Sequence, residues 1–123
     1  MLELAQGDEG NSTRDSFVFG RNQKNKVKVP LTTIDILAAE LKLALVDFIK
    51  MDIEDAEKQA LRAATVTIRK YAPGTAPASE HLPDDAVEIP RLVLAIRTGY
   101  TVRPVSCKDA ILRVDPEVLL FRP

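Results

Sequence analysis

The sequence has little of what marks a nucleic-acid-binding, membrane-spanning or disulfide-rich protein. Its formal net charge is -1 over 123 residues, so we expect no basic surface for nucleic acid or acidic lipid. The apolar runs are far shorter than a bilayer span, and the amino end lacks the pattern of a signal peptide. The single cysteine, Cys107, excludes an internal disulfide framework and is typical of a reducing compartment. We therefore expect a cytoplasmic protein with no membrane or nucleic-acid partner.

The common catalytic and nucleotide-binding motifs are absent as well. The sequence contains no GxGxxG, GxxxxGKS, HExxH, CxxC or GxSxG pattern. A nucleotide site of the usual kind needs a glycine-rich turn at which the backbone can approach the ligand. None of the 5 glycines supplies such a turn.

What is present is the composition of an ordinary soluble globular domain, with 46% hydrophobic and 28% charged residues. The length favours one domain, residues 1–123. Short strands are expected at Leu2–Leu4 and Val27–Val29, and Thr32-Thr33 opens a helix with an apolar stripe that continues to Leu45. Val46–Ile49 reads as a buried strand that leads into a helix. That helix has alanines on one face and Glu57, Lys58 and Arg62 on the other. Alternation of strands and helices predicts an α/β fold with parallel neighbouring strands.

The second half of the chain gives weaker signals. A strand is expected over 75–80, although Ala-Pro-Ala-Ser is poor strand sequence. A helix with a capping pair at Asp85 and Glu88 follows, and Gly99 is a suitable end for it. The runs 111–114 and 118–121 flank the turn Asp115-Pro116-Glu117, which predicts an antiparallel pair.

Polar residues gather at the ends of two predicted strands. The first group is Lys50, Asp52, Glu54 and Asp55, and the second is His81, Asp84 and Asp85. If the two strands are parallel neighbours, both groups face each other at one edge of the sheet, where ligands bind in open α/β sheets. Histidine with carboxylates can hold a divalent metal or perform acid–base chemistry. The alternatives are helix capping, with Asp52 as the N-cap, and an ordinary hydrogen-bonded loop histidine. Because the spacing matches no metal signature, we predict no metal ligands.

Three segments carry a family likeness. They are Thr32-Thr33 with Asp35 and Leu37, the run VDFIKMD at Val46–Asp52 with Glu54, Ala56 and Glu57, and HLPDD with EIP at His81–Pro90. Gly7–Gly10 adds a GDEG turn. Together they resemble the second half of FkbM-type S-adenosylmethionine-dependent methyltransferases, over about Leu4 to Phe121. The family shows a TT-x-D-x-L helix and a VDFIKIDVEGAE run at corresponding places.

The resemblance implies a partial Rossmann-like methyltransferase sheet, mostly of parallel strands with a C-terminal antiparallel hairpin, flanked by helices. It implies S-adenosylmethionine as cofactor and O-methylation of a small-molecule or glycan hydroxyl. By the same likeness Asp52 and Glu54 lie near the methyl-donating end of the cofactor, and His81 lies near the acceptor. Asp52 and His81 are then the catalytic residues.

Two departures from the family pattern open alternatives. Asp55 stands where the family has glycine, and the first strands of the fold, with their glycine-rich turn and ribose-binding acid, have no counterpart in the chain. We expect a half sheet with one open edge, completed by a second polypeptide or by a second copy of the chain. The competing hypothesis is a non-catalytic relative that acts as an interaction subunit or is a remnant.

Overall fold

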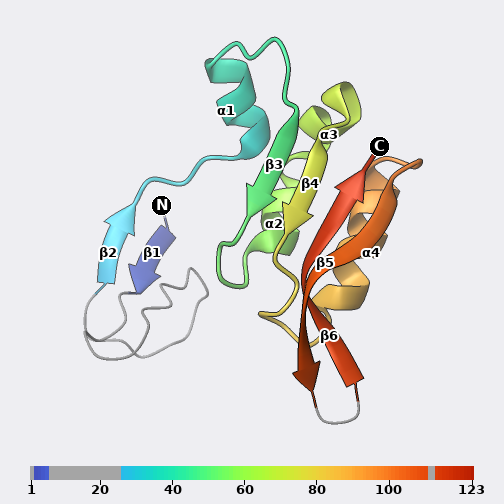
Figure 1. Cartoon of the computed structure of the whole chain (residues 1–123). Coiled ribbons are helices and arrows are strands. Elements are labelled where there is room, and N and C mark those ends of the chain that lie inside the picture. The colour runs from blue at the N-terminus through green and yellow to red at the C-terminus, as the bar shows by residue number, and fades with distance from the viewer. Residues whose placement is uncertain (1, 6–25, 111–112) are drawn as a thin grey trace.

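The computed structural model describes residues 2–5, 26–110 and 113–123 of the chain. The strands β1 (Leu2–Ala5) and β2 (Lys26–Val29) pair antiparallel in a small sheet of their own. The larger sheet has four strands, β3 (Phe48–Met51), β4 (Gly74–Pro77), β5 (Thr101–Ala110) and β6 (Arg113–Arg122). The predicted α/β class is confirmed (Figure 1). The expected Gly7–Gly10 turn lies outside the described residues.

The larger sheet is mixed, because its strand β6 runs against the other three. Its strand order is β3-β4-β6-β5, and of these neighbours only β3 and β4 run parallel, with Phe48 opposite Gly74 and Met51 opposite Pro77. Strand β6 pairs antiparallel with both β4 and β5. Strands β3, β4 and β5 therefore run in the same direction and β6 runs against them, so the predicted sheet with a C-terminal antiparallel hairpin is confirmed, although only one pair of neighbours is parallel. The second strand of the hairpin inserts between β4 and β5. The expected open edge is confirmed, because among the described strands nothing pairs with the outer side of β3.

In the described residues, four helices accompany the sheet. They are α1 (Ile34–Glu40), α2 (Glu57–Arg62), α3 (Thr65–Tyr71) and α4 (Asp85–Ile96). Helices α2, α3 and α4 cover one face of the sheet (Figure 1). The core lies between them and that face, and its fully buried members are Leu61, Ala64, Ile68, Ile89, Val93 and Phe121. Each large apolar side chain buried in this way contributes about 1.5–3 kcal/mol. Burial alternates along β3, so that Ile49 and Met51 face the helices and Phe48 and Lys50 are exposed.

The helix boundaries correct several predictions. Thr33 is the N-cap of α1, and its hydroxyl accepts a hydrogen bond from the amide of Ile36 at 3.1 Å, as the sequence predicts. The helix ends at Glu40, well short of Leu45. Asp52 is not an N-cap, since α2 begins only at Glu57. The backbone cannot be helical between them, because Glu54 and Asp55 have φ of +49° and +77°.

The hairpin is also placed differently from the prediction. Strands β5 and β6 are joined between Ala110 and Arg113, and Asp115-Pro116-Glu117 lies within β6. Pro116 is opposite Cys107, next to an irregularity in the register at Ser106. A proline is tolerated beside such an irregularity, because its missing amide then costs no regular ladder bond. Pro90 likewise lies inside α4 rather than before its regular part. Among the described residues, no helix has the length and apolar character needed to cross a membrane.

Candidate functional site

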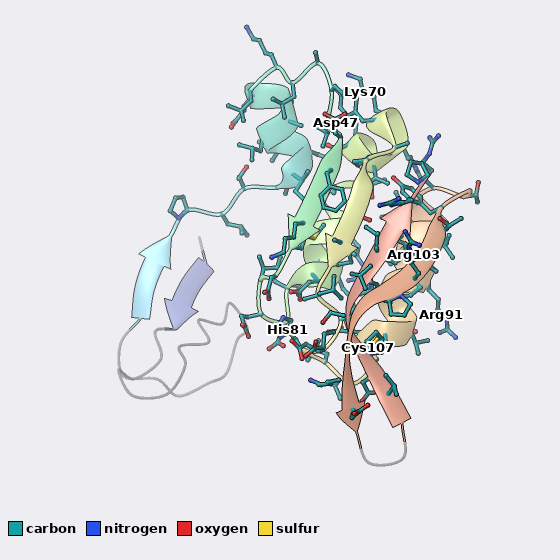
Figure 2. The ribbon with its side chains drawn as sticks, viewed as in Figure 1. Asp47, Lys70, His81, Arg91, Arg103 and Cys107 are labelled. Atoms are coloured by element: carbon teal, nitrogen blue, oxygen red, sulfur yellow. The ribbon has the colours of Figure 1, made fainter. Side chains whose placement is uncertain are left out.

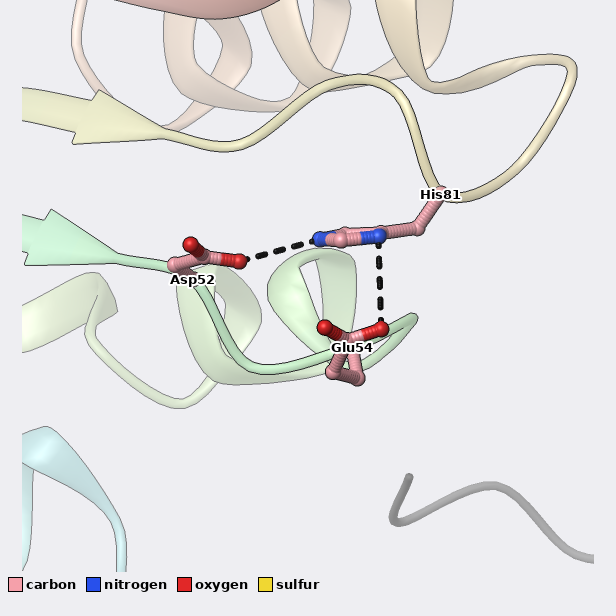
Figure 3. Close-up of side chains that lie close together, drawn as sticks. All are labelled: Asp52, Glu54 and His81. Atoms are coloured by element: carbon pink, nitrogen blue, oxygen red, sulfur yellow. Dashed lines mark hydrogen bonds and ion pairs between the residues drawn. The ribbon is translucent and has the colours of Figure 1, made fainter. Parts of the chain in front are cut away.

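Asp52, Glu54 and His81 meet at the carboxyl ends of β3 and β4. Asp52 and Glu54 follow β3, and His81 follows β4. Figure 2 shows His81 beyond the arrowheads of these strands. Nε2 of His81 lies 3.2 Å from Oδ1 of Asp52, and Nδ1 lies 3.6 Å from Oε2 of Glu54 (Figure 3). The expectation that the two polar groups face each other across parallel neighbours is confirmed for these residues.

Backbone hydrogen bonds hold the segment that carries His81. The amide of Ala78 donates to the carbonyl of Met51 at 2.8 Å, which extends the pairing of β4 with β3 past the end of both strands. The amide of Ser79 donates to the carbonyl of Glu117 at 2.8 Å, and its hydroxyl donates to the carbonyl of Pro116 at 2.9 Å. The chain just before His81 is thus fixed between β3 and β6.

The three side chains differ in their access to solvent. The side chain of His81 is only 6% exposed, that of Glu54 is 25% exposed, and that of Asp52 is 57% exposed. An incoming molecule therefore meets Asp52 first, with the imidazole of His81 behind it.

Glu57 is a fourth member of the cluster that the sequence prediction missed. Its helical spacing placed it on the face opposite the alanines, yet it is 1% exposed. Its Oε1 accepts a hydrogen bond from the amide of Ile53 at 2.8 Å and lies 3.5 Å from Nε2 of His81. Its Oε2 has no hydrogen-bond partner among the described residues. The sequence contains one indication that Glu57 belongs to the site. It ends the family-like run VDFIKMDIEDAE and is therefore part of that motif as well as of the helix.

Asp84 and Asp85 lie outside the cluster, although the prediction grouped them with His81. Both pair with Lys58 of α2, whose Nζ lies 2.7 Å from Oδ1 of Asp84 and 3.1 Å from Oδ1 of Asp85. Burial works to lower the pKa of Lys58, but its hydrogen bonds to the two aspartates outweigh this and raise that pKa. The hydrogen bond from Lys58 is the main cause that lowers the pKa of Asp84. Asp85 also accepts from the amide of Leu82 at 2.8 Å, so this pairing fixes the loop next to His81.

The backbone conformation shows why the family has glycine at the position of Asp55. Asp55 has a φ of +77°, in the left-handed region that glycine enters without steric cost. Aspartate is one of the few other residues that enter this region routinely. The chain therefore keeps the turn that carries Glu54 toward His81 in spite of the substitution.

The cluster can act in two ways chemically. An imidazole held between carboxylates can orient and exchange protons with them. One nitrogen and two carboxylate oxygens, all within 4.8 Å of one another, can also serve as ligands of a metal ion.

Comparisons with known proteins now give the family. The family described as "Methyltransferase FkbM domain" matches residues 1–100. A solved structure of the methyltransferase FkbM from Methylobacillus flagellatus KT is 30% identical, with a TM-score of 0.49. That likeness covers 60% of this chain and only 19% of the other one, so the chain spans about a fifth of that protein. Comparison with curated proteins gives no match. Because the family match extends over most of its length, the chain belongs to the FkbM methyltransferase family.

Proposed function

We propose that this chain forms the acceptor side of an S-adenosylmethionine-dependent O-methyltransferase site. The observation that carries the proposal is the meeting of Asp52 and His81 at the carboxyl ends of two parallel strands. This edge is where ligands bind in open α/β sheets. The acceptor is a hydroxyl group of a small molecule or a glycan.

The charge of the cluster suits the methyl-donating end of the cofactor. When bound, S-adenosylmethionine supplies an activated methyl group on a positively charged sulfur. Asp52 and Glu54 are carboxylates near the open side of the cluster, and they complement that positive charge. Glu54 is held toward the site by the left-handed turn that it forms with Asp55.

Asp52 is the group best placed to take the proton that the acceptor hydroxyl loses. Its side chain is exposed, whereas His81 is almost closed off from solvent. We therefore assign Asp52 the contact with the acceptor and His81 a positioning role. Nε2 of His81 donates to Oδ1 of Asp52 and orients its carboxylate. The proton is assigned to Nε2 because the carboxylate oxygen of Asp52 can only accept a hydrogen bond.

The remainder of the cofactor site needs residues beyond those of the cluster. The 123 residues contain no glycine-rich turn for the adenosine half. The outer edge of β3 pairs with no described strand, so its backbone groups are available to a further strand. We propose that such a strand, from another polypeptide or a second copy, completes the sheet there.

The first experiment is a thermal-shift titration of the 123-residue chain with S-adenosylmethionine and S-adenosylhomocysteine. Saturable stabilisation is expected, because a ligand that binds only the folded state raises the melting temperature. Asp52→Asn is the test variant, since an exposed side chain can change with little effect on folding, and Glu88→Gln is a surface control. A folded sample whose melting temperature does not move with either ligand would overturn the proposal for the chain alone.

A second candidate is an interaction subunit without methyl transfer. It is favoured by the open edge of β3 and by α1, which has no buried residue; Ile36 and Leu37 of this helix and its C-cap residue Leu41 are each more than 40% exposed. Sedimentation velocity tests it, because strand pairing at that edge predicts a dimer or a larger species. A stable monomer at all concentrations would contradict this candidate, and cofactor binding would favour the first.

A further inference from the structure

The cluster around His81 has more negative charge than its own cation can balance. Three carboxylates, those of Asp52, Glu54 and Glu57, lie within 3.6 Å of the imidazole nitrogens. Even a fully protonated imidazole supplies one positive charge against three negative charges. Lys58, on the neighbouring position of α2, is already paired with Asp84 and Asp85.

The unpartnered oxygen of Glu57 points to the same imbalance independently. Glu57 is 1% exposed, and its Oε2 has no hydrogen-bond partner in the part of the chain that the structure describes. A buried carboxylate in this state is costly unless positive charge lies close by. Its carboxyl group faces His81, with Oε1 3.5 Å from Nε2.

The spacing of the donors fits a metal ion. Donor atoms from Asp52, Glu54 and His81 all lie within 4.8 Å of one another. Neighbouring ligands at about 2.0–2.2 Å from a metal are about 2.9–3.6 Å apart. The distance of 3.2 Å between Nε2 of His81 and Oδ1 of Asp52 falls in that range. The exposed side of Asp52 gives an ion and its water ligands a way in.

We propose that Asp52, Glu54 and His81 bind a divalent transition-metal ion, with the Glu57 carboxylate adding negative charge beside Nε2 of the imidazole. The bound ion takes the place of the proton between His81 and Asp52. One imidazole with two carboxylates favours Zn²⁺ or Mn²⁺ over the hard ions Mg²⁺ and Ca²⁺, which prefer oxygen ligands alone. The site takes the metal without the cofactor, so the inference stands apart from methyl transfer.

Isothermal titration of the untagged chain with ZnCl₂, MnCl₂ and MgCl₂ tests the site, without S-adenosylmethionine. The background is Cys107→Ser, because Cys107 is an exposed free thiol that can bind Zn²⁺ by itself. We expect saturable binding, tightest for Zn²⁺ and weakest for Mg²⁺. Asp52→Asn and Glu54→Gln are each expected to weaken Zn²⁺ binding at least tenfold.

Glu88→Gln is the matched control, since it removes one carboxylate that pairs with Arg91 outside the cluster. Its affinity for Zn²⁺ should equal that of the background. His81→Gln should abolish binding, and circular dichroism would report whether this variant is folded.

No saturable heat with any ion, or equal affinity in Asp52→Asn, Glu54→Gln and Glu88→Gln, would overturn the proposal. Zn²⁺ binding without any cofactor-induced thermal shift would contradict only the methyltransferase function. A cofactor-induced shift without metal binding would contradict only the metal site.

Discussion

Nε2 of His81 lies 3.2 Å from Oδ1 of Asp52, although 29 positions separate the two residues in the chain. The parallel pairing of β3 with β4 brings them together, and the pair is strongly asymmetric in burial. The His81 side chain is 6% exposed and the Asp52 side chain is 57% exposed. The two residues should therefore contribute differently to stability.

Replacing His81 by asparagine should lower the free energy of unfolding by about 1–3 kcal/mol, because the buried carboxylate of Glu57 loses the imidazole that lies 3.5 Å from its Oε1. Asp52→Asn should change it by less than about 1 kcal/mol, since its side chain is largely solvated. Urea unfolding at neutral pH measures both. Equal losses from the two substitutions would contradict the asymmetry.

Asp35 should stabilise the contact between α1 and α3 in a pH-dependent manner. Its carboxylate accepts hydrogen bonds from the amides of Val66 at 3.0 Å and Thr67 at 2.8 Å, at the start of α3. Burial works to raise the pKa of Asp35, but these bonds and the Thr67 side chain outweigh it and lower that pKa. Asp35→Ala should cost about 1 kcal/mol, as the loss of a helix cap does.

The sign of the pH effect follows from the lowered pKa. The stabilisation by Asp35 is present above the unfolded-state pKa of about 3.9 and is lost as pH falls through the folded-state value. The difference in unfolding free energy between the native chain and Asp35→Asn should narrow below about pH 4. Asp47→Asn, at an exposed position, is the control. A difference that stays constant down to acid pH would contradict the role of the carboxylate.

Lys58 should stabilise the fold chiefly because its positive charge balances the carboxylate of Asp85, whose side chain is 2% exposed. Lys58→Met leaves that carboxylate buried without its cation and should cost about 3 kcal/mol. In the double variant with Asp85→Asn much of this loss should return, because the uncompensated charge is gone. Thermal and urea unfolding of the single and double variants measure the coupling. Strictly additive losses would mean that the pair does not act as one unit.

Asp55→Gly should stabilise the turn after β3. Asp55 has a φ of +77°, where a side chain is strained and glycine is not. The gain should be about 0.5 kcal/mol, since glycine also adds entropy to the unfolded chain. Asp55→Ala should be destabilising, because alanine lacks the local hydrogen bonding that lets aspartate adopt this conformation. A stabilising Asp55→Ala would show that the side chain, and not the backbone, is the unfavourable feature.

The sequence predicted the parts of this site that depend on local pattern. The apolar run at Val46–Ile49 predicted a strand in this region, although β3 lies two residues later, at Phe48–Met51. The polar residues after the run and at His81 were predicted to face each other, as Asp52 and His81 do. The sequence did not predict that Asp84 lies apart from His81. Helical spacing placed Lys58 and Glu57 together on an exposed face, so neither was expected to pair with residues of the predicted site. In the folded chain Lys58 draws Asp84 and Asp85 to α2, and Glu57 turns inward to His81.

The strand order and the turns depended on information that a periodic pattern does not contain. The insertion of β6 between β4 and β5 follows from pairing between distant segments, such as Thr75 with Phe121. Asp115-Pro116 is a common turn sequence, yet it lies inside a strand beside a register irregularity. Its local turn propensity was overridden by the longer antiparallel ladder.

That ladder divides the hairpin into two parts. Near Phe121, strand β6 pairs with β4, and Val118 forms a bridge with Ala78 just past the end of β4. Beyond Pro116, the only described strand that β6 pairs with is β5 (Figure 1). A ribbon of two strands is marginally stable alone, so the β5 amides that donate to β6 near Lys108 and Asp109 should exchange with solvent hydrogen far faster than those that donate to β6 near Val102 and Arg103. The ion pair between Lys108 and Glu80, at 2.6 Å, links the outer part to the residue just before His81. Each opening of the ribbon that breaks this ion pair therefore removes one of the contacts of the segment that carries His81, while the backbone bonds of Ala78 and Ser79 remain.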